Sequence, residues 1–347
     1  MKGEKISRRK YITIASAVLI AAMFGGVGNY LFQKKASPIK GSNVTSDSSI
    51  PTTFEPSVIP TPGQNSTISS TPIPTTAPII DVTPIPSDTI PKMVGEIRID
   101  RDSFSFQPEE IKTRRPDLFN PGYFSVFDVL HHLHNKGLIK LEYHFEESLI
   151  THVVDSINGE SSWRYQIYYD NGWPERNIFR MDRYPWKDRS NLGFYKANPT
   201  RLNEIYSIFR NEVARRKSNN GKLIIPKVII RGQTFTKEFK DVEVEPYNMR
   251  YDLFKKDLTT ALDVVMSLGD QGKIKYELKW MESIGRAEVV KNYWVWGIDD
   301  NIGQNRCGFV YEAGSVNHRF SGNHIHLPTD SRILNSPEYV EFFWICL

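Results

Sequence analysis

Two stretches of this chain have nearly the same sequence, and their repetition limits the folds that the chain can adopt. "GLIKLEYHF" begins at Gly137, and "GKIKYELKW" begins at Gly272, 135 positions later. The same offset relates "DLF" at Asp117 to "DLF" at Asp252. Because residue identity and hydrophobic phase are kept together, the sequence predicts two copies of one supersecondary unit. Farther on, "WRYQIYYDNG" from residue 163 matches "WVWGIDDNIG" from residue 294 at an offset of 131, which predicts a short deletion in the second copy.

Each copy contains a short predicted helix with one buried face. Ser125 precedes Asp128 by three residues and Thr260 precedes Asp263 by three, the spacing of a capping box at a helix start. The glycine that opens each repeated stretch suits a left-handed C-terminal cap. Apolar residues follow each cap at helical spacing: Val126, Val129, Leu130 and Leu133 in the first copy, and Ala261, Val264, Val265 and Leu268 in the second.

The period then changes to two, which predicts strands. The residues expected to face the core are Ile139, Leu141, Tyr143 and Phe145 in the first copy and Ile274, Tyr276, Leu278 and Trp280 in the second. Strands near 150–157 and 163–169 follow, and the last strand of each copy is predicted to begin at Arg201 and at Tyr339. The sequence therefore predicts the α+β class: two tandem small domains, 94–215 and 224–347, each with one helix on a mainly antiparallel sheet.

The N-terminal segment has the pattern of a membrane anchor. Residues 1–10 are basic, and residues 11–32 carry no charge. As a helix this stretch would be about 33 Å long, enough for a hydrocarbon core of about 30 Å. The positive-inside rule predicts a single-pass protein of the cell membrane with a cytoplasmic N-terminus and extracellular C-terminal domains. A cleaved signal peptide is the alternative, although no convincing cleavage motif follows the apolar run.

Residues 33–93 are predicted to form a disordered stalk. The segment is dominated by Ser, Thr and Pro, as in "TPIPTTAPIIDVTPIPSDTIP". Proline fixes φ and removes backbone donors, and the segment has too little clustered apolar area to offset the entropy of ordering. The stalk would hold the two domains away from the membrane.

Composition limits the partners and the redox chemistry. The net charge is +4 and part of this excess lies in the N-terminal flank, so nucleic-acid binding is not indicated. The chain has two cysteines, Cys307 and Cys346. An oxidising extracellular compartment favours a disulfide between them, but Cys346 alternates with apolar residues and could equally be a small buried side chain.

The stretch "VDSINGESSWRYQIYYDNG" resembles a bacterial and archaeal surface domain that is similar to the C-terminal domain of transcobalamin and intrinsic factor. The resemblance rests on Ser156, Ile157, Asn158 and Gly159 for a "SIxG" strand, and on Trp163, Tyr165, Tyr168, Tyr169, Asn171 and Gly172 for an aromatic hairpin. The second copy keeps Leu262, Asp263, Ser283, Ile284, Trp294, Trp296 and Gly303 but has "DDNIG" in place of the Asn-Gly turn. The resemblance implies a β-grasp-like fold in both copies. It also implies a corrinoid as one ligand class, without assigning contact residues; no other cofactor is predicted.

Aromatic and histidine residues are the candidates for a binding site. Tyr168, Trp173, Tyr184 and Trp186 lie beside charged residues, and exposed rings in such a setting stack on sugars or planar ligands. Packing in the core or between the copies is the alternative. His318, His324 and His326 could hold a zinc ion, although loop histidines explain them as well, and "HHLH" at 131–134 is better explained by a solvated helix face.

The sequence contains no nucleophile elbow, phosphate-binding glycine loop or dinucleotide fingerprint. We therefore expect a non-enzymatic, membrane-anchored binding module for a small molecule or glycan, with two copies contributing avidity. The alternative is a structural or assembly protein that binds another envelope protein. A metal-dependent hydrolase built on the three C-terminal histidines is a more distant hypothesis.

Overall fold

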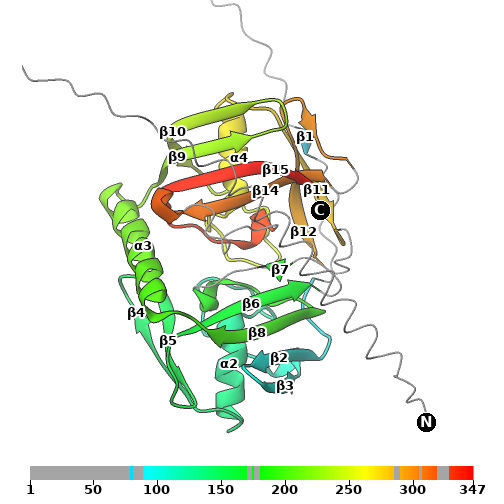
Figure 1. Cartoon of the computed structure of the whole chain (residues 1–347). Coiled ribbons are helices and arrows are strands. Elements are labelled where there is room, and N and C mark those ends of the chain that lie inside the picture. The colour runs from blue at the N-terminus through cyan, green and yellow to red at the C-terminus, as the bar shows by residue number, and fades with distance from the viewer. Residues whose placement is uncertain are drawn as a thin grey trace, which may run out of the picture. The chain divides into compact units, whose positions relative to one another are not determined.

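The computed structural model describes residues 79–80, 89–169, 174–175, 180–284, 290–304, 307–318 and 328–346, with the backbone alone at 79–80, 174–175 and 318. These residues belong to one compact unit, Pro72–Leu347. They form a mixed fold of helices and several small sheets, so the α+β class is confirmed at this level (Figure 1). The predicted anchor at 11–32 lies outside the described residues. Among the helices within them, none is both long and apolar enough to cross a membrane.

The first half of the described chain contains a five-stranded sheet, a helix and a separate hairpin. The sheet has the order β3-β2-β8-β6-β7, in which β2 and β8 run parallel and the other neighbours run antiparallel. The hairpin is β4-β5. The elements are β2 Gly95–Ile99, β3 Asp102–Phe106, α2 Val126–Asn135, β4 Leu141–Glu146, β5 Thr151–Ile157, β6 Trp163–Tyr169, β7 Pro174–Glu175 and β8 Ser190–Lys196, with 3-10 turns η1 Pro108–Glu110 and η2 Met181–Arg183.

The second half contains two four-stranded sheets and a helix. One sheet has the order β10-β9-β15-β14, with β9 and β15 parallel, and the other has the order β1-β11-β12-β13. The elements are β1 Ile79–Ile80, β9 Leu223–Arg231, β10 Thr236–Val244, α4 Ala261–Asp270, β11 Tyr276–Met281, β12 Asn292–Ile298, β13 Asn301–Ile302, β14 Cys307–Gly314 and β15 Tyr339–Cys346, with 3-10 turns η3 Val316–His318 and η4 Thr329–Ser331.

The two halves have corresponding strands in the same order and direction. Strands β3-β2-β8-β6 correspond to β10-β9-β15-β14, and the hairpin β4-β5 corresponds to β11-β12. Both hairpins have a register shift at the same place, after Glu142 and after Glu277. The predicted match between residues 163–172 and 294–303, at an offset of 131, was wrong. Trp163 begins β6, which corresponds to β14, whereas Trp294 lies in β12, the counterpart of β5.

The predicted helices are confirmed with their caps. Ser125 and Thr260 are the N-caps, and each forms a capping box with the aspartate three residues later. The eight apolar residues predicted to face the core are all fully buried, at 0% exposure. The glycine after each helix has φ near 70°, with values of 71° and 68°. Local hydrogen bonding and apolar spacing are therefore sufficient to place these two helices.

The strand predicted to begin at Arg201 was wrong. Residues Pro199–Ser218 form the long helix α3, which connects the two halves along one side (Figure 1). Asn198 caps this helix by accepting a hydrogen bond from the Arg201 N–H, and proline occupies the first turn, where its missing N–H costs nothing. The last strand of the first half is instead β8. The buried apolar residues of α3 repeat every three or four positions: Leu202, Ile205, Phe209 and Val213.

The other strand predictions agree with the structure in most positions. The strands near 150–157 and 163–169 and the one beginning at Tyr339 are β5, β6 and β15. All four residues predicted to face the core in the second copy are buried. In the first copy Ile139 and Leu141 are buried, but Phe145 is 39% exposed.

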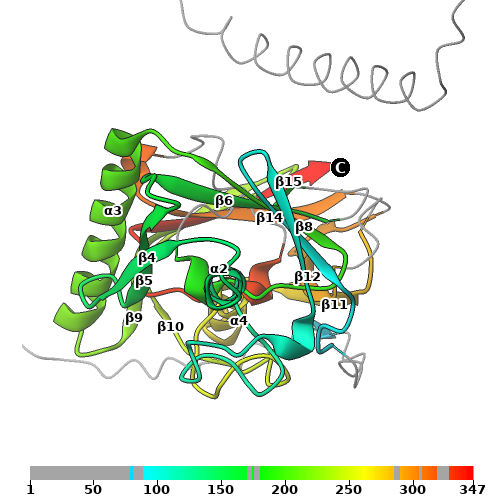
Figure 2. The same cartoon turned by 90° about the horizontal axis from the view of Figure 1, so that it is seen from below.

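The halves meet through the two "DLF" segments, which pair with each other. The Asn120 N–H donates to the Leu253 carbonyl at 3.0 Å, and the Lys255 N–H donates to the Leu118 carbonyl at 2.8 Å. Each bond maps onto the other under the 135-residue offset, so the contact is locally two-fold symmetric. Figure 2 shows α2 and α4, the helices that follow these segments, end-on at the centre of the view.

The C-terminal end of the predicted stalk contacts this junction. The Thr89 hydroxyl donates to Asp252 Oδ2 at 2.8 Å, and the N–H groups of Lys92 and Met93 each donate to Asp188 Oδ1 at 2.9 Å. Farther back, β1 pairs in parallel with β11. The chain therefore joins the folded unit before the predicted boundary at residue 94.

Candidate functional site

A groove lies on the outer face of the five-stranded sheet, opposite the core of the first half. It has a volume of about 200 Å³ and is open to solvent. Its outward-facing lining comes from strands β3, β2, β8 and β6: Ser103, Glu96, Arg98, Asn191, Gly193, Tyr195 and Tyr168. The groove thus contains Tyr168, one of the four aromatic residues predicted to bind a ligand.

Strand periodicity explains why these residues gather on one face. Residues Ile97, Leu192, Phe194 and Ile167 point inward and are buried, so their immediate neighbours in sequence point outward. Gly193 pairs with Arg98 on one side and Gln166 on the other, and so lies at the centre of this face. A methyl group at Gly193 would lie 2.5 Å from the Tyr195 hydroxyl oxygen. Glycine therefore allows the tyrosine side chain to lie across the sheet.

The groove combines aromatic surface with both signs of charge. Tyr168 is partly exposed, and its hydroxyl donates to Gln166 Oε1 at 2.9 Å. The guanidinium of Arg164 lies 5.9 Å from the centre of the Tyr195 ring. Glu96 and Arg98 are exposed along the neighbouring strand. Rings held in place beside hydrogen-bonding groups suit a polar ligand with flat apolar faces.

The corresponding positions in the second half are buried. By strand register, Glu341 of β15 takes the place of Gly193, and Ile229 of β9 takes the place of Arg98. Glu341 is fully buried and accepts a hydrogen bond from Arg231, and Ile229 is 2% exposed. The groove is therefore a property of the first half only, within the part of the chain that the structure describes.

Two of the predicted aromatic residues are in the core, which agrees with the packing alternative and not with an exposed binding site. Tyr184 is 3% exposed and Trp186 is 1% exposed. Trp186 stacks on Phe124 with ring centroids 5.6 Å apart, and it also packs edge-on against Phe106. The segment after η2 turns inward here, because Ser125 and Pro185 form a bridge and the Val126 N–H donates to the Tyr184 carbonyl at 3.0 Å. Trp173 lies outside the described residues.

The candidate metal ligands are not tested by the described residues. His324 and His326 lie outside them, and only the backbone of His318 is described, in η3. Within the described part of the chain, no group of three or more His, Cys, Asp or Glu side chains could hold a metal ion. Cys307 and Cys346 form a disulfide between directly paired residues of β14 and β15.

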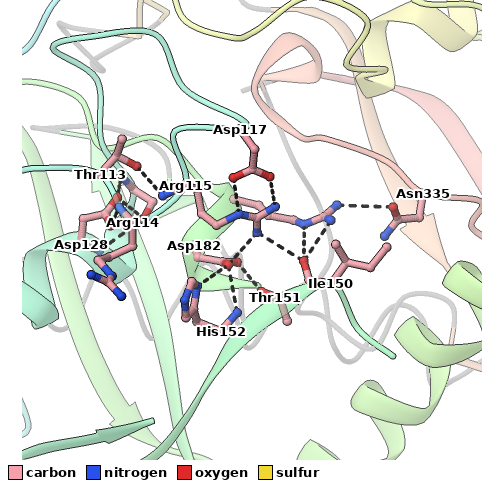
Figure 3. Close-up of polar contacts among 12 residues, drawn as sticks. Thr113, Arg114, Arg115, Asp117, Asp128, Ile150, Thr151, His152, Asp182 and Asn335 are labelled. Carbon is pink, nitrogen blue, oxygen red and sulfur yellow. Dashed lines mark hydrogen bonds and ion pairs between the residues drawn. The ribbon is translucent and has the colours of Figure 1, made fainter. Parts of the chain in front are cut away.

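A buried ionic network occupies the junction side of the first half (Figure 3). The Arg115 guanidinium donates to both oxygens of Asp117, at 2.9 and 2.7 Å, and to Asp182 Oδ2 at 2.7 Å. Asp182 also accepts from Thr151 and from both Nδ1 and the backbone N–H of His152, each at 2.9 Å. Burial would raise the pKa of Asp182, but the hydrogen bond from His152 and the charge of Arg115 outweigh it and lower this pKa to about 2.

The second half repeats this network. Arg250 donates to both oxygens of Asp252, each at 2.9 Å, and to Asp330 Oδ2 at 3.2 Å. Asp330 accepts from the backbone N–H of Tyr293 at 2.8 Å, as Asp182 does from that of His152. Each arginine also donates to a carbonyl just before the strand, that of Ile150 or Lys291, and both of those residues have positive φ.

Sequence reasoning missed these arginines. The signal was available, because "RPDLF" and "RYDLF" share an arginine two residues before the aspartate at the 135-residue offset. Since both halves contain the same arginine network at the same place, we interpret it as part of the fold. The His152 ring, which stacks on Phe127 at 4.8 Å, has no counterpart imidazole in the second half, where Tyr293 takes its place.

No protein-family model and no curated protein matches the chain. The resemblance to the transcobalamin-like surface domain therefore stays a prediction that depends on the residues quoted for it. The candidate site is identified from the geometry of the Tyr168 groove alone.

Proposed function

We propose that this chain is a membrane-anchored, extracytoplasmic binding module that takes up a glycan or another polar, flat-faced small molecule in the Tyr168 groove. In this proposal residues 11–32 anchor the chain and the stalk carries two tandem β-grasp-like units. The shared strand order of the two halves supports the tandem arrangement. The observation that carries the binding function is the groove itself, which pairs two tyrosine rings with Glu96 and Arg98.

The difference between the halves supports a ligand-binding role for the groove. In the second half, which has a sheet of the same strand order, the positions of Gly193 and Arg98 are taken by the buried Glu341 and Ile229, so the fold does not require an open surface at this place. Concave sites lined by aromatic side chains and a few polar groups are typical of small-molecule binding. Sugar rings present apolar faces to aromatic rings and hydroxyls to charged side chains, which fits this lining.

Titration of the purified full-length protein with cell-wall glycan fragments and corrinoids tests the proposal. We expect saturable binding that Tyr168→Ala and Tyr195→Ala each weaken by tenfold or more, because each removes one stacking surface. Gly193→Val should weaken binding as well by displacing the Tyr195 ring. Tyr251→Ala is the matched control, since this tyrosine is 67% exposed and lies outside the groove.

Two results would count against the proposal. One is the absence of saturable binding to every ligand class tested. The other is binding that survives both tyrosine substitutions. Recovery of a specific envelope protein in cross-linking from native membranes, dependent on groove residues but with no small-molecule binding, would favour the assembly function instead.

A further inference from the structure

A second cavity lies where η2 of the first half meets η4 of the second, and arginine dominates its lining. Arg180 and Arg183 come from the turn before β8, and Arg332 comes from the turn before β15. The remaining lining residues are Tyr184, Phe209, Ser331 and Ile333, so the cavity wall itself carries three positive charges and no carboxylate. The cavity between them is small, about 20 Å³, and it opens to solvent, so only the oxygens of a bound group could enter it.

The nearby carboxylates are paired with arginines, one of them with the cavity residue Arg180, although Glu212 Oε1 has no donor among the described residues. Glu212 Oε2 accepts from Arg180 Nη1 at 3.0 Å, and Asp182 is bonded to Arg115. Arg183 donates to the Ile150 carbonyl, at 3.3 Å from Nε and 3.1 Å from Nη2, and has no carboxylate at hydrogen-bonding distance among the described residues. It is only 7% exposed. Burial and the neighbouring charge of Arg180 lower the pKa of Arg183 to about 9, as expected for excess positive charge.

The side chain of Asn335 offers these arginines a neutral amide oxygen as an acceptor and no negative charge. Its side-chain oxygen lies 3.5 Å from Arg183 Nη1. Rotating the amide by half a turn places this oxygen 3.1 and 2.9 Å from the two terminal nitrogens of Arg180. In that orientation Arg183 keeps only the Ile150 carbonyl as an acceptor among the described residues.

Two buried guanidinium nitrogens also have no acceptor among the described residues. These are Arg180 Nε and Arg332 Nη1. Buried donors in native proteins nearly always have a partner, so each such group needs an explanation. Guanidinium groups present rigid donor pairs that match the oxygens of phosphate, sulfate and carboxylate, and this match explains why arginine is preferred in oxyanion sites.

We propose that the cavity formed by Arg180, Arg183 and Arg332 is a binding site for a small oxyanion: a phosphate, sulfate or carboxylate group. Because the three arginines come from both halves, the bound anion holds the two turns together. The site is independent of the Tyr168 groove, which lies on the outer face of the first sheet. It does not depend on the proposed glycan binding.

Calorimetric titration of the full-length protein in detergent tests this proposal. Sodium phosphate, sulfate, acetate and glucuronate are added separately at constant ionic strength, and melting temperatures are recorded in parallel. We expect one of these anions to bind saturably with a stoichiometry near one and to raise the melting temperature. Phosphate or sulfate as the preferred ligand indicates a tetrahedral anion, and glucuronate indicates a carboxylate from an acidic sugar.

Arg183→Gln and Arg332→Gln should each reduce this affinity at least tenfold. Arg101→Gln, which changes an exposed arginine outside the cavity, should leave it unchanged. Arg332 is only partly buried, so its substitution stays informative if the Arg183 variant does not fold. The proposal is overturned if no anion binds the wild-type protein saturably, or if binding persists in the Arg332 variant.

Discussion

Replacing Asp182 by asparagine should destabilise the fold more than any single change at an exposed charge. Asp182 is fully buried and lies 2.7 Å from Arg115, whose side chain is 4% exposed. Removing one partner of a buried ion pair typically costs about 3–5 kcal/mol when the other charge is left unpaired, and Arg115 keeps its exposed partner Asp117, which places the cost at the lower end. The lowered pKa of Asp182, about 2 instead of 3.8, gives an independent figure of about 2.5 kcal/mol. We therefore expect a loss of about 3 kcal/mol in the free energy of unfolding.

The same arginine provides the control. Asp117 makes two hydrogen bonds with Arg115, but its side chain is 59% exposed. Exposed pairs contribute about 0–1 kcal/mol, so Asp117→Asn should cost much less than Asp182→Asn. In the second half, Asp330→Asn should resemble Asp182→Asn, because Asp330 is also fully buried against Arg250.

Urea unfolding at pH 7, followed by tryptophan fluorescence, measures all three variants. The pKa of Asp182 is lowered in the folded state, so its contribution is present above about pH 4 and is lost as the pH falls toward 2. The difference between wild type and Asp182→Asn should therefore shrink over this window. Equal costs for Asp117→Asn and Asp182→Asn, or a cost below 1 kcal/mol for Asp182→Asn, would refute the reasoning.

Three further predictions use other features of the fold. The Cys307–Cys346 disulfide spans 39 positions, and its reduction should lower the free energy of unfolding by up to about 4 kcal/mol. Urea unfolding with and without reductant measures this difference. No change on reduction would show that other contacts already constrain the loop in the unfolded state. Gly137→Ala and Gly272→Ala should each cost about 1–2 kcal/mol through backbone strain alone, because nothing lies within 4 Å of the added methyl group; a neutral effect in thermal melts would contradict the left-handed caps. Burial raises the pKa of Asp263 to about 7, so the stability that its protonated form contributes is complete below about pH 4 and is lost as the pH rises through 7. Thermal melts from pH 4 to 8 should show this loss of stability in the wild type and not in Asp263→Asn.

Local rules placed the repeated helices and most strands because their signals lie within a few residues. A capping box, a helical apolar stripe and a closing glycine define each short helix without reference to the rest of the chain. The same local reasoning failed at residues 201–209. A mixed apolar and polar run there fits a strand by eye, whereas the decisive signal is the Asn198 cap with the proline after it.

The candidate sites were harder to predict because they depend on which strands become neighbours. Tyr168 was found from its outward position in a strand, but Gly193, Arg98 and Tyr195 join it only through the pairing of β2 with β8 and of β8 with β6. Tyr184 and Trp186 have the composition of an exposed site and lie in the core, because the bridge between Ser125 and Pro185 turns their segment inward. Sequence adjacency to charged residues does not determine exposure.

Comparing the two halves separates residues that serve the fold from those available for function. The arginine networks, the capping boxes and the left-handed glycines occur in both halves. We therefore interpret each of them as serving the fold. Among the described residues, the open tyrosine groove and the arginine pair Arg180 and Arg183 occur in one half only. Two sheets with the same strand order fold with an open surface at Gly193 and with the buried Glu341 at the corresponding position, so folding does not account for the groove. The residues that differ between the halves are therefore the ones whose substitution should alter binding with the smallest effect on stability.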